Sequence, residues 1–378
     1  MRDGPDSVER AAGNAPAVPM LQVRPGYLIS RLIKGGWQLA GDHGTVDRAQ
    51  AINDMIEFAN AGVVTFDCAD IYTGVEEMIG AFRAELTRQR GEAASQKIKI
   101  HTKYVPDRDN LANLSFRDIE AGIDRSLRRL GQEHLDLVQF HWWNYAVEGC
   151  EEAVGHLAKL RDKGKIDQIG VTNFDLEHLE RLAAVTDIAS SQVQYSLLDK
   201  RVEGDFAAFA KVNNISIFAY GVLAGGFLTD AWLDEPDPGY QFENRSLVKY
   251  RLIIDEVGGW DLFQDLLTAL RAVADRHNTD IATIALRAML DRSDVATAIV
   301  GARYASRLPN LLAVFGITMT SRDQADINTV CSRANGPNGP VFGLERDISG
   351  PHGRIMKYNL NKGDNRQATT AVQKSETV

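Results

Sequence analysis

The sequence predicts a single (β/α)8 barrel, or TIM barrel, of the α/β class, with an N-terminal extension, a long loop insertion and a C-terminal tail. Eight short apolar segments are each followed by a stretch with the apolar spacing of a helix. This alternation covers about 290 residues, which suits a closed barrel of parallel strands. An open, doubly wound sheet is the alternative, but no G-x-G-x-x-G follows the first expected strand.

The strands are expected where apolar and β-branched residues cluster between turn residues. An extension, residues 1–24, is small and polar and is expected to be flexible. Thr45 is the expected N-cap of the first helix, and Gly62 stands where that helix would end. The strands are expected at residues 33–39, 63–66, 98–105, 135–140, 166–171, 191–195, 215–220 and 295–300.

The clearest helix signal starts at Ser115. Ser115 and Asp118 form an S-x-x-D start, apolar residues then recur every three or four positions, and Gly131 ends the pattern. Other helices are expected at residues 46–59, 152–162, 176–184, 204–212, 262–277, 281–291 and 308–315. Residues 229–260 are expected to be an irregular insertion within a barrel domain, residues 25–330. The tail, residues 331–378, is rich in Gly and Pro and then polar, and we expect a loop with a partly disordered end.

The composition is that of a globular protein. Hydrophobic residues make up 44% and charged residues 25% of the 378 residues, which is enough apolar material for a large core. The net charge is −9 (42 basic minus 51 acidic residues), and there is no long basic run. These values argue against nucleic acid or an anionic membrane surface as a partner, and no segment is apolar enough to span a membrane.

The cysteines are few and widely spaced. Cys68, Cys150 and Cys331 form no CxxC pair, so neither a disulfide framework nor a metal site is expected. The first twenty residues contain acidic residues and no apolar run typical of a secretory signal. A cytoplasmic location is the expectation that follows.

Polar residues follow the expected strands, where the active site of a barrel enzyme lies. Asp67 ends the second strand and Tyr72 follows in its loop, while Lys103 and His141 end the third and fourth strands. A lysine ammonium about 4 Å from a tyrosine would favour the tyrosinate by on the order of 4 kcal/mol at an effective dielectric constant near 20. A carboxylate can hold the lysine, and a neutral histidine can orient a substrate oxygen. Such a set can protonate a carbonyl oxygen, and a nicotinamide cofactor would be needed for hydride transfer.

At these residues the sequence resembles the aldo-keto reductases. The resemblance runs from about residue 29 to residue 315, with its motifs in the expected order. The motifs are FDCADIY (66–72), EEMIG (76–80), HTKY around Lys103, QFHWW around His141, IGVTNF (169–174), SQVQYS (191–196), FAYGVLAGGFL (218–228) and IVGAR (299–303).

The resemblance implies a catalytic role for four residues and a family of reactions. Tyr72 falls on the general acid/base, Lys103 and Asp67 on its ion pair, and His141 on the histidine that orients the substrate. The implied reaction is NADPH-dependent reduction of an aldehyde or ketone to an alcohol, or its reverse. The implied partner is a small-molecule carbonyl or alcohol; its identity and the oligomeric state stay open.

The resemblance also implies a cofactor site. Thr172, Asn173 and Gln192 fall on the residues that hold the nicotinamide carboxamide, and Tyr220 on the ring that stacks on the nicotinamide. The loop 221–225 falls on the segment that crosses the pyrophosphate, where glycines allow close approach. The cofactor contacts so implied are Gly36, Trp37, Thr172, Asn173, Gln192, Tyr220, Gly221, Leu223, Gly225, Gly301, Arg303 and Arg307. The two arginines suit the 2′-phosphate of NADPH, which is favoured over NADH.

One departure concerns the adenine. The family has an asparagine in the final helix, and this sequence has Leu311 there, with Asn310 beside it as a candidate substitute. For Arg307, an exposed helix arginine without a function is the plain alternative.

The substrate pocket is less defined by the sequence. Trp37, Tyr104 and Trp142 are the aromatic residues expected to line it, with ordinary packing as the alternative for each. The rival to an enzyme is a regulatory binding protein with the same barrel and cofactor, like the potassium-channel β-subunits. All four catalytic positions carry the required side chains, which favours an enzyme.

Overall fold

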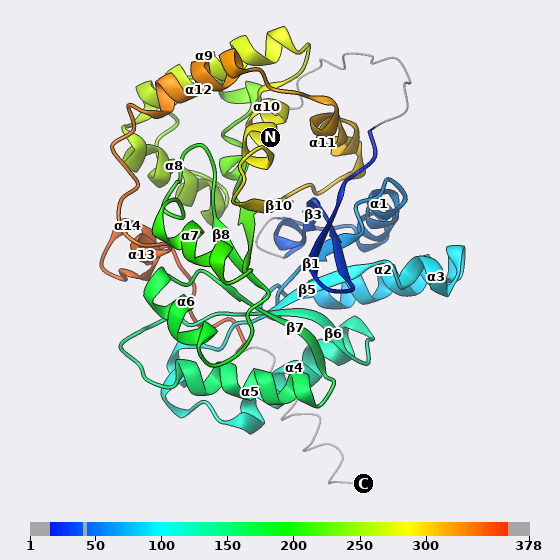
Figure 1. Ribbon diagram of the computed structural model, residues 1–378. Coiled ribbons are helices and arrows are strands. Elements are labelled where there is room, and N and C mark those ends of the chain that lie inside the picture. Colours follow the sequence, from blue (N-terminus) through cyan, green and yellow to red (C-terminus); the bar gives the residue numbers. More distant parts are fainter. Residues whose placement is uncertain (1–15, 41–43, 362–378) are drawn as a thin grey trace.

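A computed structural model describes residues 16–40 and 44–361 of the chain (Figure 1). Eight parallel strands close into a barrel in the order β10-β3-β4-β5-β6-β7-β8-β9, so the predicted (β/α)8 barrel is confirmed and the open sheet is excluded. The barrel strands are β3 (Leu32–Gly35), β4 (Thr65–Asp67), β5 (Lys99–Tyr104), β6 (Leu135–Phe140), β7 (Ile166–Thr172), β8 (Ser190–Gln194), β9 (Ser216–Tyr220) and β10 (Val295–Val300). Pairing of β10 with β3 closes the ring.

Helices surround the barrel, and two of them, α9 and α12, run side by side at its edge (Figure 1). The helices are α1 (Arg48–Asn60), α2 (Val75–Arg90), α3 (Glu92–Ser95), α4 (Phe116–Leu130), α5 (Cys150–Asp162), α6 (Leu176–Ala183), α7 (Asp205–Val212), α8 (Arg245–Val257), α9 (Trp260–Arg276), α10 (Ile281–Leu290), α11 (Leu308–Ala313), α12 (Ser321–Cys331), α13 (Gly343–Arg346) and α14 (Pro351–Arg354).

Local signals predicted some helix ends and missed others. The capping box of Ser115 and Asp118 is confirmed, and Gly131 ends α4 in the left-handed conformation. The predicted N-cap of the first helix was wrong. Asp47, not Thr45, caps α1, because its carboxylate accepts a hydrogen bond from the backbone of Gln50.

The first barrel strand is shorter than predicted. It ends at Gly35, and Trp37–Leu39 form a turn of 3-10 helix instead of continuing the strand. The Gly36 N–H still donates to the carbonyl of Asp67 at 2.7 Å, and the turn that follows places the Trp37 ring 4.8 Å from the Tyr72 ring, between ring centres.

A hairpin closes the amino end of the barrel. Strands β1 (Met20–Arg24) and β2 (Tyr27–Ser30) pair antiparallel, so the expectation of a flexible extension is wrong for residues 20–24. Val23, Tyr27 and Ile29 pack against residues inside the barrel, including Phe218. Burial of these apolar side chains stabilises the hairpin on the barrel floor. Residues 1–15 of the expected extension lie outside the described residues.

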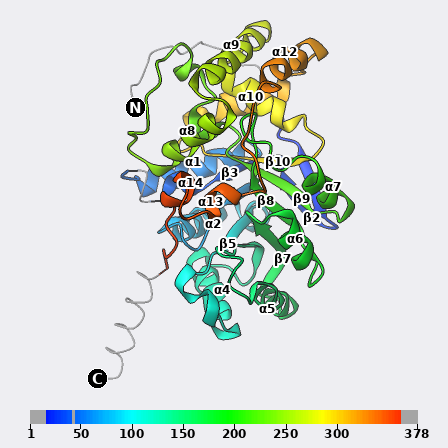
Figure 2. The ribbon, with the colours of Figure 1, turned by 90° about the vertical axis from the view of Figure 1, so that its left-hand side faces the viewer.

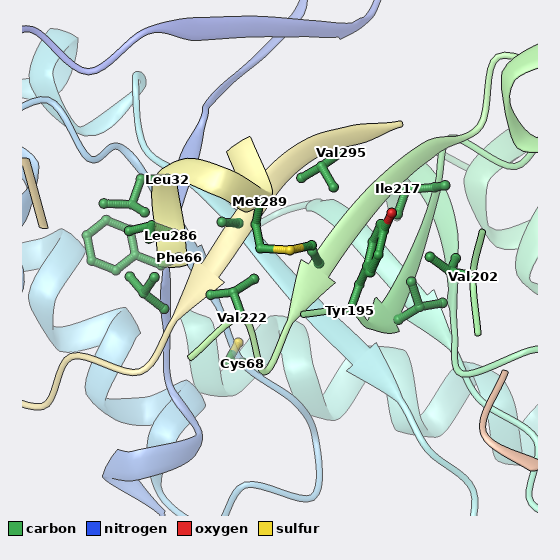
Figure 3. Packing of buried hydrophobic residues seen from close by; sticks show 14 of the residues in the cluster. Leu32, Phe66, Cys68, Tyr195, Val202, Ile217, Val222, Leu286, Met289 and Val295 are labelled. Carbon is green, nitrogen blue, oxygen red and sulfur yellow. The ribbon is translucent and has the colours of Figure 1, made fainter. Parts of the chain in front are cut away.

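The main core lies between the barrel and its helices. In Figure 3, Leu286 and Met289 of α10 lie among barrel residues such as Leu32, Phe66 and Val295. Because helices cover the outer face and side chains fill the interior, the strands are buried on both faces. This packing fixes the strand ends on which the polar rim stands.

Two segments expected to be irregular cover the carboxyl end of the barrel. The insertion 229–260 contains α8, a 13-residue helix that the sequence reading missed. The segment 332–361 carries α13 and α14 and lies beside α8, so the described part of the tail is packed (Figure 2). Residues 362–378 of the tail, which was expected to have a partly disordered end, lie outside the described residues.

Among the residues that the structure describes, we found no helix with the length and apolar character needed to cross a membrane.

Candidate active site

A buried ion pair lies at the carboxyl end of the barrel. Asp67 ends β4, and the Lys103 Nζ on β5 donates to both of its carboxylate oxygens at 2.7 Å and to the Cys68 carbonyl at 2.8 Å. Both side chains are at least nine-tenths buried. Removing either partner would leave an uncompensated charge away from water, so the two depend on each other.

Tyr72 lies directly beside this pair. The turn after β4 holds it through hydrogen bonds of the Tyr72 N–H to Ala69 and of the Val75 N–H to Tyr72. The Lys103 Nζ is 5.3 Å from the centre of the Tyr72 ring. Within the described part of the chain, the Tyr72 hydroxyl makes no hydrogen bond, which leaves it available to a bound molecule.

The expected effect of Lys103 on Tyr72 was wrong. Burial raises the pKa of the Tyr72 hydroxyl well above its ordinary value, and the Asp67 carboxylate raises it further. The Asp67 carboxylate, 2.7 Å from the Lys103 ammonium, offsets the lysine charge, so burial decides the direction of the net shift of the Tyr72 pKa. Tyr72 is therefore a protonated phenol at neutral pH, which is the form that can give a proton away.

His141 is a neutral imidazole with one nitrogen fixed. Its Nδ1 lies 3.0 Å from the carbonyl oxygen of Thr172, which can only accept, so Nδ1 carries the proton. Burial lowers the His141 pKa to about 3, and the charge of Arg346 contributes. The Nε2 atom is buried and has no partner among the described residues. A neutral imidazole with this tautomer presents Nε2 as an acceptor for a hydroxyl group.

Two glutamines complete the surroundings of Asp67. The side-chain amides of Gln139 and Gln192 donate to its Oδ1 at 3.2 and 2.9 Å. The sequence reading missed Gln139. Strand alternation is the signal that could have found it, since Gln139 lies two residues before His141 and so faces the same side of β6.

The residues expected to hold a nicotinamide lie together. The Tyr220 hydroxyl donates to Asn173 Oδ1 at 2.8 Å, and the Thr172 hydroxyl donates to the Gln192 carbonyl at 3.1 Å. The Nδ2 of Asn173 makes no side-chain hydrogen bond in the described region, and Gln192 Oε1 has only a long contact of 3.4 Å with Thr172. A donor and an acceptor side by side match a carboxamide, so these residues fit a nicotinamide.

The glycine loop after β9 is covered by the helical insertion. Gly221 and Gly225 have positive φ angles of 69° and 66°. A Cβ atom at Gly221 would lie 2.4 Å from the Tyr250 hydroxyl of α8, and one at Gly225 would lie 2.5 Å from the Tyr250 ring. The close approach that these glycines allow is therefore to Tyr250. Leu223, also expected to contact the cofactor, lies half-buried between them.

The aromatic residues expected in the substrate pocket separate into different environments. Trp37 is at the site, 4.8 Å from Tyr72 between ring centres, and its indole donates to Ser246 of α8. Tyr104 is not, because it follows the inward-facing Lys103 on β5 and packs on Gly122 of α4. The expectation for Tyr104 is therefore wrong in this structure.

Trp142 is also placed differently from the expectation. It is fully buried, and its indole donates to the carbonyls of Asn144 and Val147 in its own loop. The neighbouring Trp143 lies against His141, with ring centres 4.3 Å apart. Adjacent residues face opposite directions in extended chain, so only one of the two tryptophans can face the site.

The remaining residues expected to contact the cofactor lie at the rim between β10, β3 and α1. A Cβ at Gly36 would lie 2.7 Å from the Asp67 carbonyl, and one at Gly301 would meet the Gln38 amide. Arg303 donates to the Thr45 carbonyl and lines a cavity of about 390 Å³ beside the start of α1. Arg307 is exposed, and its side chain makes no hydrogen bond or ion pair with the described residues.

The substitute proposed for the adenine contact is already engaged. Asn310 donates its amide to Asp280 at 2.9 Å, and Asp280 caps α10. Leu311 is half-buried against the core. These contacts give Asn310 a structural role at the N-terminal end of α10.

Three charged residues at the site were not predicted. Lys249 of α8 lies 3.4 Å from the Tyr220 hydroxyl and 3.6 Å from Glu345 of the tail. Glu345 pairs with Arg201 at 3.0 Å, and Arg346 follows it. The sequence could not predict their place at the barrel, because they come from segments without a sequence motif.

Comparison with known proteins agrees with this geometry. Residues 31–331 match the model of the Aldo/keto reductase family. The chain is 29% identical over 330 residues to aldo-keto reductase YhdN of Bacillus subtilis, covering 84% of this chain and 95% of that protein. It is 26% identical to the NADH-specific methylglyoxal reductase of Escherichia coli, over 78% of this chain and 92% of that protein.

A solved structure shows the same fold. The glycerol dehydrogenase AKR11B4 from Gluconobacter oxydans superposes with a TM-score of 0.68 at 24% identity, covering 85% of this chain and 97% of that chain. The barrel and the match over most of the chain lead to one conclusion: this protein belongs to the aldo/keto reductase family.

Proposed function

We propose that this protein is an NADPH-dependent oxidoreductase that reduces an aldehyde or ketone to an alcohol, or catalyses the reverse reaction. The observation that carries the proposal is the protonated Tyr72 phenol beside the buried Lys103–Asp67 pair, with the unpartnered Nε2 of His141 in the same rim. Phenol, ammonium, carboxylate and imidazole together suit proton transfer to a carbonyl oxygen.

Each residue has a stated task in this mechanism. Tyr72 gives its proton to the substrate oxygen during reduction, and Lys103, held by Asp67, stabilises the tyrosinate left behind. His141 accepts the hydroxyl hydrogen of the alcohol at Nε2 and so orients its oxygen. The bound nicotinamide would supply or take up the hydride, since no side chain can do so. Thr172, Asn173, Gln192 and Tyr220 are the residues that would hold it.

The preference for NADPH rests on Arg307 and Arg303. Arg307 is exposed without a side-chain partner in the described part of the chain, and a guanidinium suits a phosphate. One relative is NADH-specific by name, so the preference needs its own test. We expect Arg307→Met to raise the KM for NADPH about tenfold and to leave the KM for NADH unchanged, because a charge-assisted hydrogen bond contributes about 1.5–3 kcal/mol. Equal effects on both cofactors would contradict the assignment.

The whole proposal is tested by following NADPH oxidation at 340 nm, the absorbance of the reduced nicotinamide. The purified chain is assayed against aldehydes, ketones and quinones of different size and polarity, and cofactor binding is measured in parallel. Steady oxidation with several carbonyl compounds is the expected result. Tight NADPH binding without turnover on any of them, together with a co-purifying partner protein, would instead indicate a regulatory binding protein.

A further inference from the structure

We propose that Arg346, in the C-terminal tail, is a positioning residue of the active site, which holds the ends of β6 and β7 so that His141 and Asn173 keep their orientations. This proposal rests on the proposed function. The guanidinium donates to the carbonyl of Trp142 and, at 2.7 Å, to the carbonyl of Asn173. One planar group thus bridges two neighbouring barrel strands directly beyond their last residues.

The two bridged carbonyls belong to residues that directly follow His141 and the residue that orients it, Thr172. Trp142 follows His141, and Asn173 follows Thr172, whose carbonyl fixes the His141 ring at 3.0 Å. Separation of the two strand ends would therefore lengthen the bond between His141 and Thr172. A shift of about 1 Å at a reacting group can reduce the rate on the order of 10²-fold.

Asn173 needs this support because of its backbone. Its φ angle of 62° lies in the left-handed region, which costs free energy for any residue other than glycine. Its N–H donates to the Gln192 carbonyl at 2.9 Å, its side-chain oxygen accepts from Tyr220, and its carbonyl accepts from Arg346. Arg346 provides the part of this set that comes from outside the barrel.

The tail is anchored so that Arg346 has a fixed position. The preceding residue, Glu345, is fully buried and pairs with Arg201 at 3.0 Å, which in turn pairs with Asp199 at 2.7 Å. The Arg346 guanidinium also stacks 3.8 Å from the centre of the Tyr145 ring. Two consecutive residues therefore attach α13 to separate parts of the rim.

Arg346 has an electrostatic effect as well as a geometric one. It makes no salt bridge to a carboxylate within the described residues; Tyr145, Asp175 and Cys150 act on its charge without forming such a pair. The rings packed around His141, those of Trp143, Phe174 and Phe342, carry no charge. After burial, the charge of Arg346 is the main cause that lowers the His141 pKa.

Two substitutions separate the geometric role from the electrostatic one. Arg346→Met keeps an apolar stem over Tyr145 but removes the charge and both hydrogen bonds. Arg346→Lys keeps the charge but cannot bridge two carbonyls with a planar fork. The matched control is Arg354→Met, an exposed arginine of the same tail.

The assay is the initial rate of NADP+-linked oxidation of an alcohol. Because Tyr72 must lose its proton in this direction, log kcat/KM rises with pH, and protonation of His141 below its pKa adds a steeper acid limb that reports His141. For Arg346→Met we expect kcat to fall on the order of 10²-fold and the acid limb of log kcat/KM to move to higher pH, because the His141 pKa rises. For Arg346→Lys we expect a smaller fall in kcat and an acid limb that stays in place. Arg354→Met should match the unchanged enzyme in both.

The outcomes distinguish this proposal from the one on which it rests. If the unchanged protein turns over and Arg346→Met keeps its kcat and its acid limb, the positioning role is refuted. A variant that only melts at a lower temperature, with normal kinetics when folded, also refutes it, since that marks a purely structural residue. If the unchanged protein turns over none of the substrates, the proposed function itself fails, whatever Arg346 does.

Discussion

The two ends of the barrel carry the same four kinds of side chain, but we expect chemistry at only one of them. At the carboxyl end these are Tyr72, Lys103, His141 and Asp67; at the amino end they are Tyr27, Lys99, His101 and Asp136. The local geometry is also similar. The lysine-to-carboxylate distances are 2.7 and 2.8 Å, and the lysine nitrogens lie 5.3 and 5.2 Å from the tyrosine ring centres.

The surroundings of the two sets differ. His101 lies between the rings of Tyr27 and Phe218, 6.2 and 5.4 Å away, and neither of its ring nitrogens has a partner in the described structure. His141 has one nitrogen fixed by Thr172 and stands beside amides and a hydroxyl that match a carboxamide. A set of residue types therefore does not make a site; an oriented imidazole and groups that can bind a cofactor are also needed.

The largest expected effect separates the two tyrosines. Tyr72→Phe removes the proton donor, so we expect kcat to fall on the order of 10²–10⁴-fold while NADPH binding stays measurable. Tyr27→Phe is the matched control and should leave kcat unchanged. Steady-state kinetics with a substrate from the carbonyl panel provide the comparison. A Tyr72→Phe variant with nearly full turnover would show that the two ends differ less than we argue.

The second prediction compares the two lysines of β5. Lys103→Met leaves the buried Asp67 without its counter-charge and should lower the free energy of unfolding by about 3–5 kcal/mol. Lys99→Met should cost less, about 1–2 kcal/mol, because Lys99 is partly exposed whereas Lys103 is buried. Each carboxylate keeps hydrogen bonds from two other groups. Urea unfolding followed by circular dichroism measures both; equal losses would contradict the difference in burial.

The third prediction concerns acid stability. Burial lowers the pKa of His101 to about 3, far below the ordinary value near 6.5. Between these values the unfolded chain binds a proton that the folded chain does not, so stability is present above pH 6.5 and is lost as the pH falls toward 3. His101→Leu should therefore make the fall in stability shallower by about 1.4 kcal/mol per pH unit. An unchanged slope in urea titrations at pH 4, 5 and 6 would show that His101 is protonated in the folded protein.

The smallest expected effect is on the stability of Tyr27→Phe. The Tyr27 hydroxyl is buried and has no partner among the described residues. Removing an unsatisfied hydroxyl should leave the free energy of unfolding unchanged or raise it by up to about 1 kcal/mol. A loss of more than about 1 kcal/mol would indicate that the hydroxyl has a hydrogen-bond partner, such as a buried water.

The parts of the site that the sequence predicted share one property. Asp67, Lys103 and His141 follow apolar strands, and in a parallel barrel all strand ends meet at one rim, so their order along the chain places them together. Tyr72 follows within the same short loop. The fold and this rim could therefore be derived from local pattern and topology.

Two predictions of pocket residues failed because they depended on the direction of a side chain and not on its place in the chain. Tyr104 and Trp142 are next to site residues in the chain, but each faces the opposite side from its neighbour. Helix α8 was missed because Pro236 and Pro238 precede it and its apolar face is short, although Asn244 is a capping residue.

By itself the sequence determined the alternation of strands and helices, the closed barrel and the four residues at its rim, because these depend on spacing along the chain. Only the tertiary structure decided that a hairpin closes the other end, that Tyr250 covers the glycine loop and that Arg346 bridges the chain beyond β6 and β7. These contacts join segments far apart in the chain, and the local spacing of apolar residues does not indicate which distant segment packs against a given strand end.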